Sequence, residues 1–191
     1  MKKLIAISLI SVFAIANETN STNPNMAVAK EGVKYIKTLG KALKENVGKR
    51  LKEDPSGVKA AEFCSKEAKK VAKEAMKDFP KNIKVRRTSL KYRNEHNKPD
   101  EIDTKILTQM EEALKAKTLE KKPKVVDVNG TKRVYVPLIV EKACTKCHGD
   151  VEKMNPKVKE IISKAYPNDK AVGFKEGDLR GAVVAEIAPK K

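Results

Sequence analysis

Residues 125–140, VVDVNGTKRVYVPLIV, carry the clearest structural signal in the chain. Two β-branched runs flank Asn129-Gly130, a dipeptide that favours a tight hairpin turn because both of its residues accept a positive φ. Pro137 has no backbone N–H to donate, so it fits best at a strand edge or a strand end. We therefore expect an antiparallel hairpin here.

Upstream of the hairpin, the sequence predicts two long helices. Asp54-Pro55 separates them, because proline is accepted in a first helical turn. The second helix is expected to end at Pro80, with Cys64 on its alanine-rich inward stripe. In the first helix, from Met26 onward, apolar residues recur every three or four positions and form one stripe: Val33, Ile36, Leu39, Leu43, Val47 and Leu51.

The remaining stretches complete an α+β pattern. Residues 83–90 have the composition of a strand, and the polar stretch 93–100 predicts a turn that opens a third helix. After the hairpin we expect a short helix over 157–165 and a last strand over 182–188. Helices first and a small antiparallel sheet built mostly from the second half predict one α+β domain over residues 26–188.

The first 25 residues predict export. Two lysines precede an apolar run over residues 4–14, and Ala14-Ile15-Ala16 matches a small-residue cleavage site, so residues 1–16 are expected to be a signal peptide. An uncleaved anchor is the alternative, but the run is well short of the ~20 residues that span a bilayer. Residues 17–25 predict a flexible leader. We expect a periplasmic protein with no transmembrane segment in the mature chain.

The chain is strongly basic, with 42 Lys and Arg against 25 Asp and Glu and a net charge of +17. Such a charge is also typical of proteins that bind nucleic acid. Export argues against it, and the lysines are spread along the chain and do not cluster with aromatic residues. A solvated surface or docking onto acidic partners or anionic lipid is the better interpretation.

Residues 141–150, EKACTKCHGD, carry the chemistry. Cys144, Cys147 and His148 form CxxCH, the attachment signature of a c-type haem. Two thiols one helical turn apart can each add to a porphyrin vinyl group, and the next residue then lies where an imidazole nitrogen reaches the iron. The chain has 3 cysteines and 2 histidines in all, so chance would rarely place three of them within five residues. One covalent haem c is therefore predicted.

Other interpretations of this motif fit less well. A zinc site made of Cys144, Cys147, Cys64 and a histidine would need adjacent Cys147 and His148 to reach one metal, which is rare. A redox-active CxxC motif is typical of a helix start in a βαβ unit, and the hairpin that precedes Cys144 does not provide one. It would also leave His148 unexplained.

His148 is the predicted proximal iron ligand, and the residue pattern leaves the opposite ligand open. Cys64 is a third thiol in a compartment where free thiols tend to be consumed, although an inert buried cysteine is equally compatible. His96 sits in a polar turn. Methionine is also a familiar iron ligand in cytochromes c, and the chain offers Met26, Met76, Met110 and Met154.

Four stretches together resemble a known family: AAEFCSKEAKKVA at 60–72, KVRRTSLKYRNEHNKPD at 84–100, PLIVEKACTKCHGD at 137–150 and DKAVGFKEGDLRGAVV at 169–184. They resemble c-type haem proteins with a PAS-like fold, which occur alone or as extracytoplasmic sensor domains of histidine kinases. The resemblance covers about Ala27 to Ala188. It implies long N-terminal helices on an antiparallel sheet, with the haem between helices and sheet.

The resemblance also implies that the iron is held by the motif histidine and by a cysteine of the early helix, here His148 and Cys64. The family usually has a proline where Glu95 stands, and His96 is not expected, so His96 stays a competitor for the iron. How the haem propionates are held is not implied. Arg86, Arg87 and Arg93 are candidate charge-assisted donors to them.

A thiolate ligand stabilises ferric over ferrous iron, so we predict a low reduction potential. We also predict that reduction weakens the thiolate bond, so that protonation or a ligand such as CO or NO can displace Cys64. The preferred function is electron transfer with an acidic redox partner. The alternative is a haem-based redox or gas sensor that signals through a partner such as a sensor kinase. No acid–base constellation accompanies the motif, so an enzyme is not expected.

Overall fold

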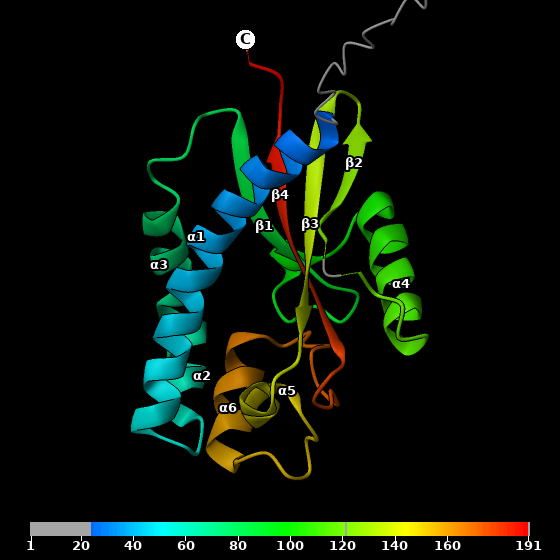
Figure 1. Ribbon diagram of the computed structural model, residues 1–191. Coiled ribbons are helices and arrows are strands. Elements are labelled where there is room, and N and C mark those ends of the chain that lie inside the picture. Colours follow the sequence, from blue (N-terminus) through cyan, green and yellow to red (C-terminus); the bar gives the residue numbers. More distant parts are fainter. Residues whose placement is uncertain (1–23, 121, 191) are drawn as a thin grey trace, which may run out of the picture.

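The computed structural model describes residues 24–120 and 122–190 (Figure 1). The predicted signal peptide and residues 17–23 of the predicted leader lie outside them. The elements, in chain order, are α1 (Pro24–Glu53), α2 (Val58–Lys66), α3 (Ala68–Ala75), β1 (Ile83–Thr88), η1 (Glu95–Asn97), α4 (Glu101–Lys115), β2 (Lys124–Val128), β3 (Thr131–Ile139), η2 (Lys142–Cys144), α5 (Thr145–His148), α6 (Pro156–Ala165) and β4 (Leu179–Ile187).

The four strands form one antiparallel sheet in the order β1-β4-β3-β2. The predicted hairpin is present, and Asn129 and Gly130 both take a positive φ, 51° and 80°. Pro137 lies in β3, a central strand. At Pro137, β3 pairs with β4 alone, because the pairing of β3 with β2 ends at Tyr135 in the part of the chain that the structure describes. The proline thus occupies a local edge, where its missing N–H leaves no ladder bond unmade.

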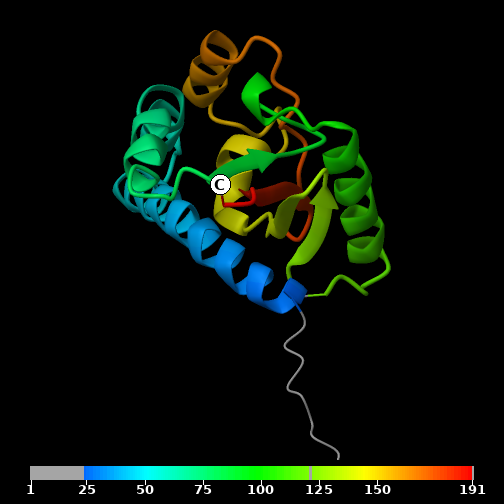
Figure 2. The same ribbon diagram turned by 90° about the horizontal axis from the view of Figure 1, so that it is seen from above.

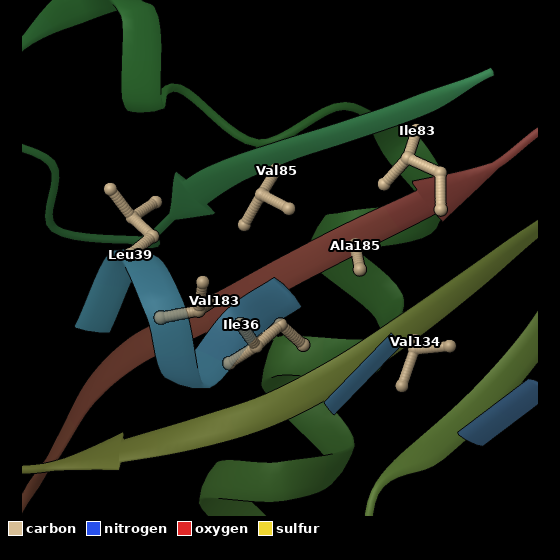
Figure 3. Packing of buried hydrophobic residues seen from close by; sticks show 7 residues of the cluster. All are labelled: Ile36, Leu39, Ile83, Val85, Val134, Val183 and Ala185. Carbon is tan, nitrogen blue, oxygen red and sulfur yellow. The ribbon is translucent and has the colours of Figure 1, made fainter. Parts of the chain in front are cut away.

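The sheet is covered on both faces. Because side chains alternate along a strand, Val183 and Ala185 of β4 face α1, whereas Ala182 and Val184 face α4. Figure 3 shows Ile36 and Leu39 of α1 pointing onto the strands. The α1 cluster comprises Ile36, Leu39, Ile83, Val85, Val134, Val183 and Ala185. The α4 cluster comprises Ile106, Leu107, Met110, Tyr135, Leu179, Ala182 and Val184.

The α+β fold predicted from the sequence is confirmed, and its sheet behind a long N-terminal helix is consistent with the PAS-like arrangement. Several boundaries differ. α1 begins at Pro24, so the last two residues of the predicted leader are helical. The last strand begins at Leu179, three residues earlier than predicted.

The predicted second helix is in fact two helices, and this correction affects Cys64. The break falls at Glu67, whose φ and ψ are −110° and −28° and whose carboxylate accepts a hydrogen bond from Arg50 of α1 over 3.0 Å. Cys64 is exposed and does not lie on a buried stripe. The residues of α2 that are buried are Ala60, Ala61 and Phe63.

One end of the sheet is surrounded by short elements. Here α2, α5 and α6 gather near the end of β3 and the start of β4 (Figures 1 and 2). α2 packs against α6 through Ala61, Val158 and Ile162. Among the helices of residues 24–120 and 122–190, none is long and apolar enough to cross a bilayer.

Candidate functional site

The CxxCH motif lies at this end of the sheet. Cys144 ends η2 and directly precedes α5, the single helical turn that carries Cys147 and His148. The turn closes with a hydrogen bond from the N–H of Gly149 to the carbonyl of Thr145 over 2.9 Å. Residues three apart on a helix lie on the same side, so the two half-buried thiols are presented together.

The imidazole of His148 is oriented by backbone. Its Nδ1 lies 2.8 Å from the carbonyl oxygen of Ala171, and because a carbonyl can only accept, Nδ1 carries the hydrogen. Burial, with the positive charges of Arg180 and Arg93, holds the pKa of His148 well below its usual value of 6.5. A neutral imidazole with Nε2 left as a lone pair is a competent metal ligand.

The segment that supplies Ala171 runs beside the motif. The N–H of Phe174 donates to the carbonyl of His148 over 2.9 Å, and the N–H of Gly173 donates to the carbonyl of Gly149 over 2.8 Å. The Phe174 ring stands edge-on to the imidazole, with the ring centroids 6.4 Å apart. His148 is therefore held through its backbone and its ring by one neighbouring segment.

Cys147 and Cys64 belong to the same site. Burial, together with the neighbouring Cys64, raises the pKa of Cys147 to about 11. The Cys147 sulfur also lies 3.9 Å from the carbonyl oxygen of Gly57, at the start of α2. α2 thus brings its own N-terminus and Cys64 to the motif.

Cys64 borders open space and yet has protein around it. The residue is exposed, whereas burial by surrounding protein atoms raises the pKa of its thiol, against the opposing charges of Arg87, Arg93 and Arg50. The Cys64 side chain is thus reached by solvent and at the same time has protein atoms and cationic groups around it. The residue predicted through the family resemblance as the opposite iron ligand is therefore gathered with the motif.

The three arginines proposed as propionate donors separate. Arg86 and Arg87 point to opposite faces of the sheet, and Arg86 is on the α4 side, bonded to Asp103 over 2.6 Å and to Glu186 over 2.8 Å. The structure does not bring it to the motif. Arg87 is exposed and acts on the pKa of both Cys64 and His148.

Arg93 lies at the motif, but protein groups occupy its guanidinium. Its Nη2 donates to the carbonyl of Cys147 over 2.6 Å and to that of Ala171 over 3.1 Å, and its Nε donates to Asp169 over 3.1 Å. The side chains of Arg93 and Asp169 are each 10% exposed. Arg93 is thus part of the support of the motif.

Arg180 is a site residue that sequence reasoning missed. Its Nη1 donates to the Ser89 hydroxyl over 2.9 Å and to the Lys91 carbonyl over 3.1 Å. Burial and the charges of Arg93 and Arg87 lower the pKa of Arg180 to about 10. It lies within the stretch 169–184 that carries the family resemblance, which was the one signal available for it.

The other candidate ligands are placed differently. His96 is exposed in η1, and its Nδ1 lies 3.0 Å from the side chain of Asn94. Met26 is 63% exposed, whereas Met76 and Met110 pack against the two faces of the sheet. Met154 is the methionine that shares a cluster with Cys147.

These residues fit a covalently attached haem. Two thiols lie one helical turn apart, and the imidazole beside them has its other nitrogen anchored. A third thiol and cationic side chains lie near enough to shift the pKa values of Cys147 and His148. For the zinc alternative, the part of the chain that the structure describes holds no group of three or more His, Cys, Asp and Glu side chains placed to bind a metal ion.

Two comparisons with known proteins found a match, one to a family model and one to a solved structure. The family model for Tll0287-like proteins matches residues 14–188. Among solved structures, the chain is similar to the crystal structure of the cyanobacterial haem protein Tll0287, with 23% identity, a TM-score of 0.63, and coverage of 88% of this chain and 98% of that chain. At that identity the structural likeness shows the fold alone. A comparison with curated proteins gave no match.

Proposed function

The chain belongs to the Tll0287-like family, and from this premise and the site we propose that it is an exported monohaem c-type protein that transfers electrons. Cys144 and Cys147 would hold the haem covalently, His148 would offer Nε2 to the iron, and Cys64 would offer its sulfur as the second protein ligand. The bound haem supplies one-electron redox chemistry. The observation that carries the proposal is the hydrogen bond from His148 Nδ1 to Ala171 within a CxxCH turn.

The cationic residues at the site have two roles in this proposal. Arg87 and Arg180 are the arginines left to face the haem carboxylates, since Arg86 is paired with Asp103 and Arg93 with Asp169. They also affect Cys64. Burial raises the pKa of the Cys64 thiol, whereas the positive charges of Arg87, Arg93 and Arg50 lower it and so favour the thiolate.

The surface around the motif suits an acidic partner. Lys142 and Lys146 are exposed and alternate with the two motif cysteines, on a chain with a net charge of +17. A basic field speeds association with an oppositely charged protein. Electron transfer requires close approach to the haem edge, and these lysines lie where such an approach would occur. We propose no catalytic role.

The decisive experiment is expression in cells competent in c-type haem maturation, followed by intact mass and visible spectra. We expect the mature chain, without residues 1–16 and in the periplasmic fraction, to carry one added haem and a Soret band. A Cys144→Ser and Cys147→Ser double variant should carry none. Wild-type protein with no added haem mass and no Soret band would overturn the proposal.

The opposite ligand is tested separately by EPR spectra and redox titration. We expect a thiolate-type low-spin ferric spectrum that is lost in Cys64→Ala and kept in Met154→Leu, and a low reduction potential. A spectrum with a methionine band, lost in Met154→Leu, would assign the ligand to Met154. It would leave the covalent haem unaffected.

Sensing is the alternative function, and the breaks that flank α2 favour it. Asp54–Gly57 precedes this helix and Glu67 follows it, so the helix that bears Cys64 is separate from both α1 and α3. Loss of the Cys64 ligand on reduction, coupled to movement of α2, would support sensing through a partner. Fast reversible electron exchange with the ligand retained would support electron transfer.

A further inference from the structure

The carbonyl oxygen of Ala171 is shared by two donors, His148 Nδ1 at 2.8 Å and Arg93 Nη2 at 3.1 Å. A backbone carbonyl has two lone pairs, and here both are used. The group that orients the imidazole is therefore itself held by a guanidinium cation. From this arrangement we propose that Arg93 and Asp169 form a clasp that positions His148 and moderates its strength as an iron ligand, acting through Ala171. The inference rests on the proposed haem function.

Asp169 completes the clasp from the other side. One carboxylate oxygen accepts from the N–H of Ala171 over 2.8 Å, and the other accepts from Arg93 Nε over 3.1 Å. The pair thus binds both the N–H and the carbonyl of Ala171. Because Arg93 and Asp169 carry opposite charges and are each 10% exposed, they can stay in this sheltered place as an ion pair.

Arg93 of the clasp also binds the backbone of the residue that precedes His148. Arg93 donates to the carbonyl of Cys147 over 2.6 Å, directly ahead of His148. One guanidinium therefore fixes both the residue that precedes the ligand and the carbonyl to which the ligand ring donates. A lysine ammonium is a point charge and cannot span the three acceptors in the plane that a guanidinium offers.

The consequence for the ligand follows from the shared carbonyl. A hydrogen bond from the far nitrogen of a ligating histidine raises the basicity of the ligand. The charge of Arg93 draws electron density from the Ala171 oxygen and weakens that bond, so His148 is a weaker donor than it would be to a free carbonyl. A weaker donor beside a positive charge favours the reduced iron. Arg93 is a positioning residue in this scheme and does not contact the propionates.

The test compares Arg93→Gln with Lys170→Gln, which removes a positive charge next to Asp169 whose ammonium bonds to the Tyr92 hydroxyl and not to Ala171. Haem content is read first from intact mass. We expect haem-bearing Arg93→Gln to show a ratio of oxidised to reduced protein, at a fixed solution potential, about tenfold or more above wild type. The Lys170→Gln ratio should change by less than about a third of that factor.

A second measurement reports how firmly the His148 ring is held and does not depend on the charge of Arg93 alone. Without Arg93 the closed His148–Ala171 bond should be stronger, but residues 169–171 should open more often because the clasp is lost. In the reduced protein, the exchange rate of the His148 Nδ1 proton with solvent, measured by NMR, should therefore rise about tenfold or more in Arg93→Gln and in Asp169→Asn, and stay near wild type in Lys170→Gln. If Arg93→Gln does not fold, Arg93→Lys takes its place. The lysine variant keeps the charge, so it should retain the wild-type oxidation ratio and still show the faster exchange.

The outcomes separate the two proposals. Wild-type protein without haem would overturn both. Haem-bearing Arg93→Gln that matches Lys170→Gln in ratio and exchange would overturn the clasp alone. Wild-type exchange in Arg93→Lys would do the same when that variant is the one that folds.

Discussion

The hydroxyl of Tyr166 donates a hydrogen bond to the carbonyl oxygen of Cys64 over 2.9 Å. Cys64 lies near the end of α2, where carbonyls lack intrahelical partners, and Tyr166 caps the end of α6. This bond joins residues 102 positions apart in the chain. It therefore ties the helix that carries the proposed iron ligand to the helix that follows the CxxCH turn.

We predict that Tyr166→Phe loosens α2 while leaving its ring packing in place. Loss of one hydrogen bond should lower the free energy of unfolding by about 1 kcal/mol. In the reduced haem protein, CO should displace Cys64 several times faster than in wild type, as measured by stopped-flow absorbance. The matched control is Tyr92→Phe, which removes the hydroxyl that accepts from Lys170 over 3.2 Å and does not hold α2. Equal displacement rates in the two variants would contradict the prediction.

We expect the ionisation of Asp103 to determine part of the protein's stability at acid pH. It is fully buried, and Arg86 and Tyr135 donate to it over 2.6 Å and 2.8 Å. Burial disfavours the carboxylate, but the hydrogen bonds from Arg86 and Tyr135 outweigh it and hold the pKa of Asp103 below 3.8. Because the folded pKa is lowered, this stability is present above pH 3.8 and is lost as the pH falls through the folded value.

We predict that Asp103→Asn lowers the free energy of unfolding at pH 7 by about 2–3 kcal/mol, the scale for hydrogen bonds to a charged group. The difference from wild type should shrink below pH 3.8. Denaturant unfolding at several pH values measures both. Glu160→Gln, in the exposed pair with Lys164 at 2.6 Å, is the control and should leave stability nearly unchanged at any pH, because water screens an exposed ion pair. A pH-independent loss in Asp103→Asn would contradict the ionisation argument.

α1 should tolerate alanine at Gly40 but not at Gly32. A Cβ at Gly32 would lie 2.6 Å from Cγ2 of Val134, a fully buried residue of β3, whereas nothing lies within 4 Å of one at Gly40. Overpacking costs about 1–3 kcal/mol, and replacing a helical glycine gains about 1 kcal/mol. Gly32→Ala should thus be destabilised by about 1 kcal/mol and Gly40→Ala stabilised, by denaturant unfolding. Equal stabilities would show that α1 shifts freely on the sheet.

Sequence patterns predicted the features that neighbouring residues determine. The Asn129-Gly130 hairpin and the CxxCH turn are local, so their residues and spacing suffice. The break at Glu67 has no proline or glycine to mark it, and it coincides with a contact to Arg50 in another helix. Local propensity carries no information about such a contact.

Only those site residues that belong to a local motif or to a stretch with the family resemblance could be predicted from the sequence. The alternation along β1 separates Arg86 from Arg87, but choosing between them requires knowing which sheet face adjoins the motif. Arg180 and Tyr166 act across about 90 to 100 residues, beyond the range of any periodicity. Arg93 was proposed as a propionate donor, and only the structure shows that it lies at the motif and that protein acceptors occupy its guanidinium.

The last prediction concerns the lysines beside the motif. Lys142 and Lys146 are exposed next to Cys144 and Cys147, so their charge should speed the approach of an anionic electron acceptor. We expect the double change to glutamate to slow oxidation of the reduced protein by ferricyanide several-fold at low salt. The effect should fade near 1 M salt, where charges are screened beyond about 3 Å. Lys105→Glu with Lys117→Glu, on exposed positions of α4 and just after it, changes the net charge equally and should slow oxidation less. Equal slowing by the two pairs would mean that net charge alone governs the approach and that the motif face has no special role.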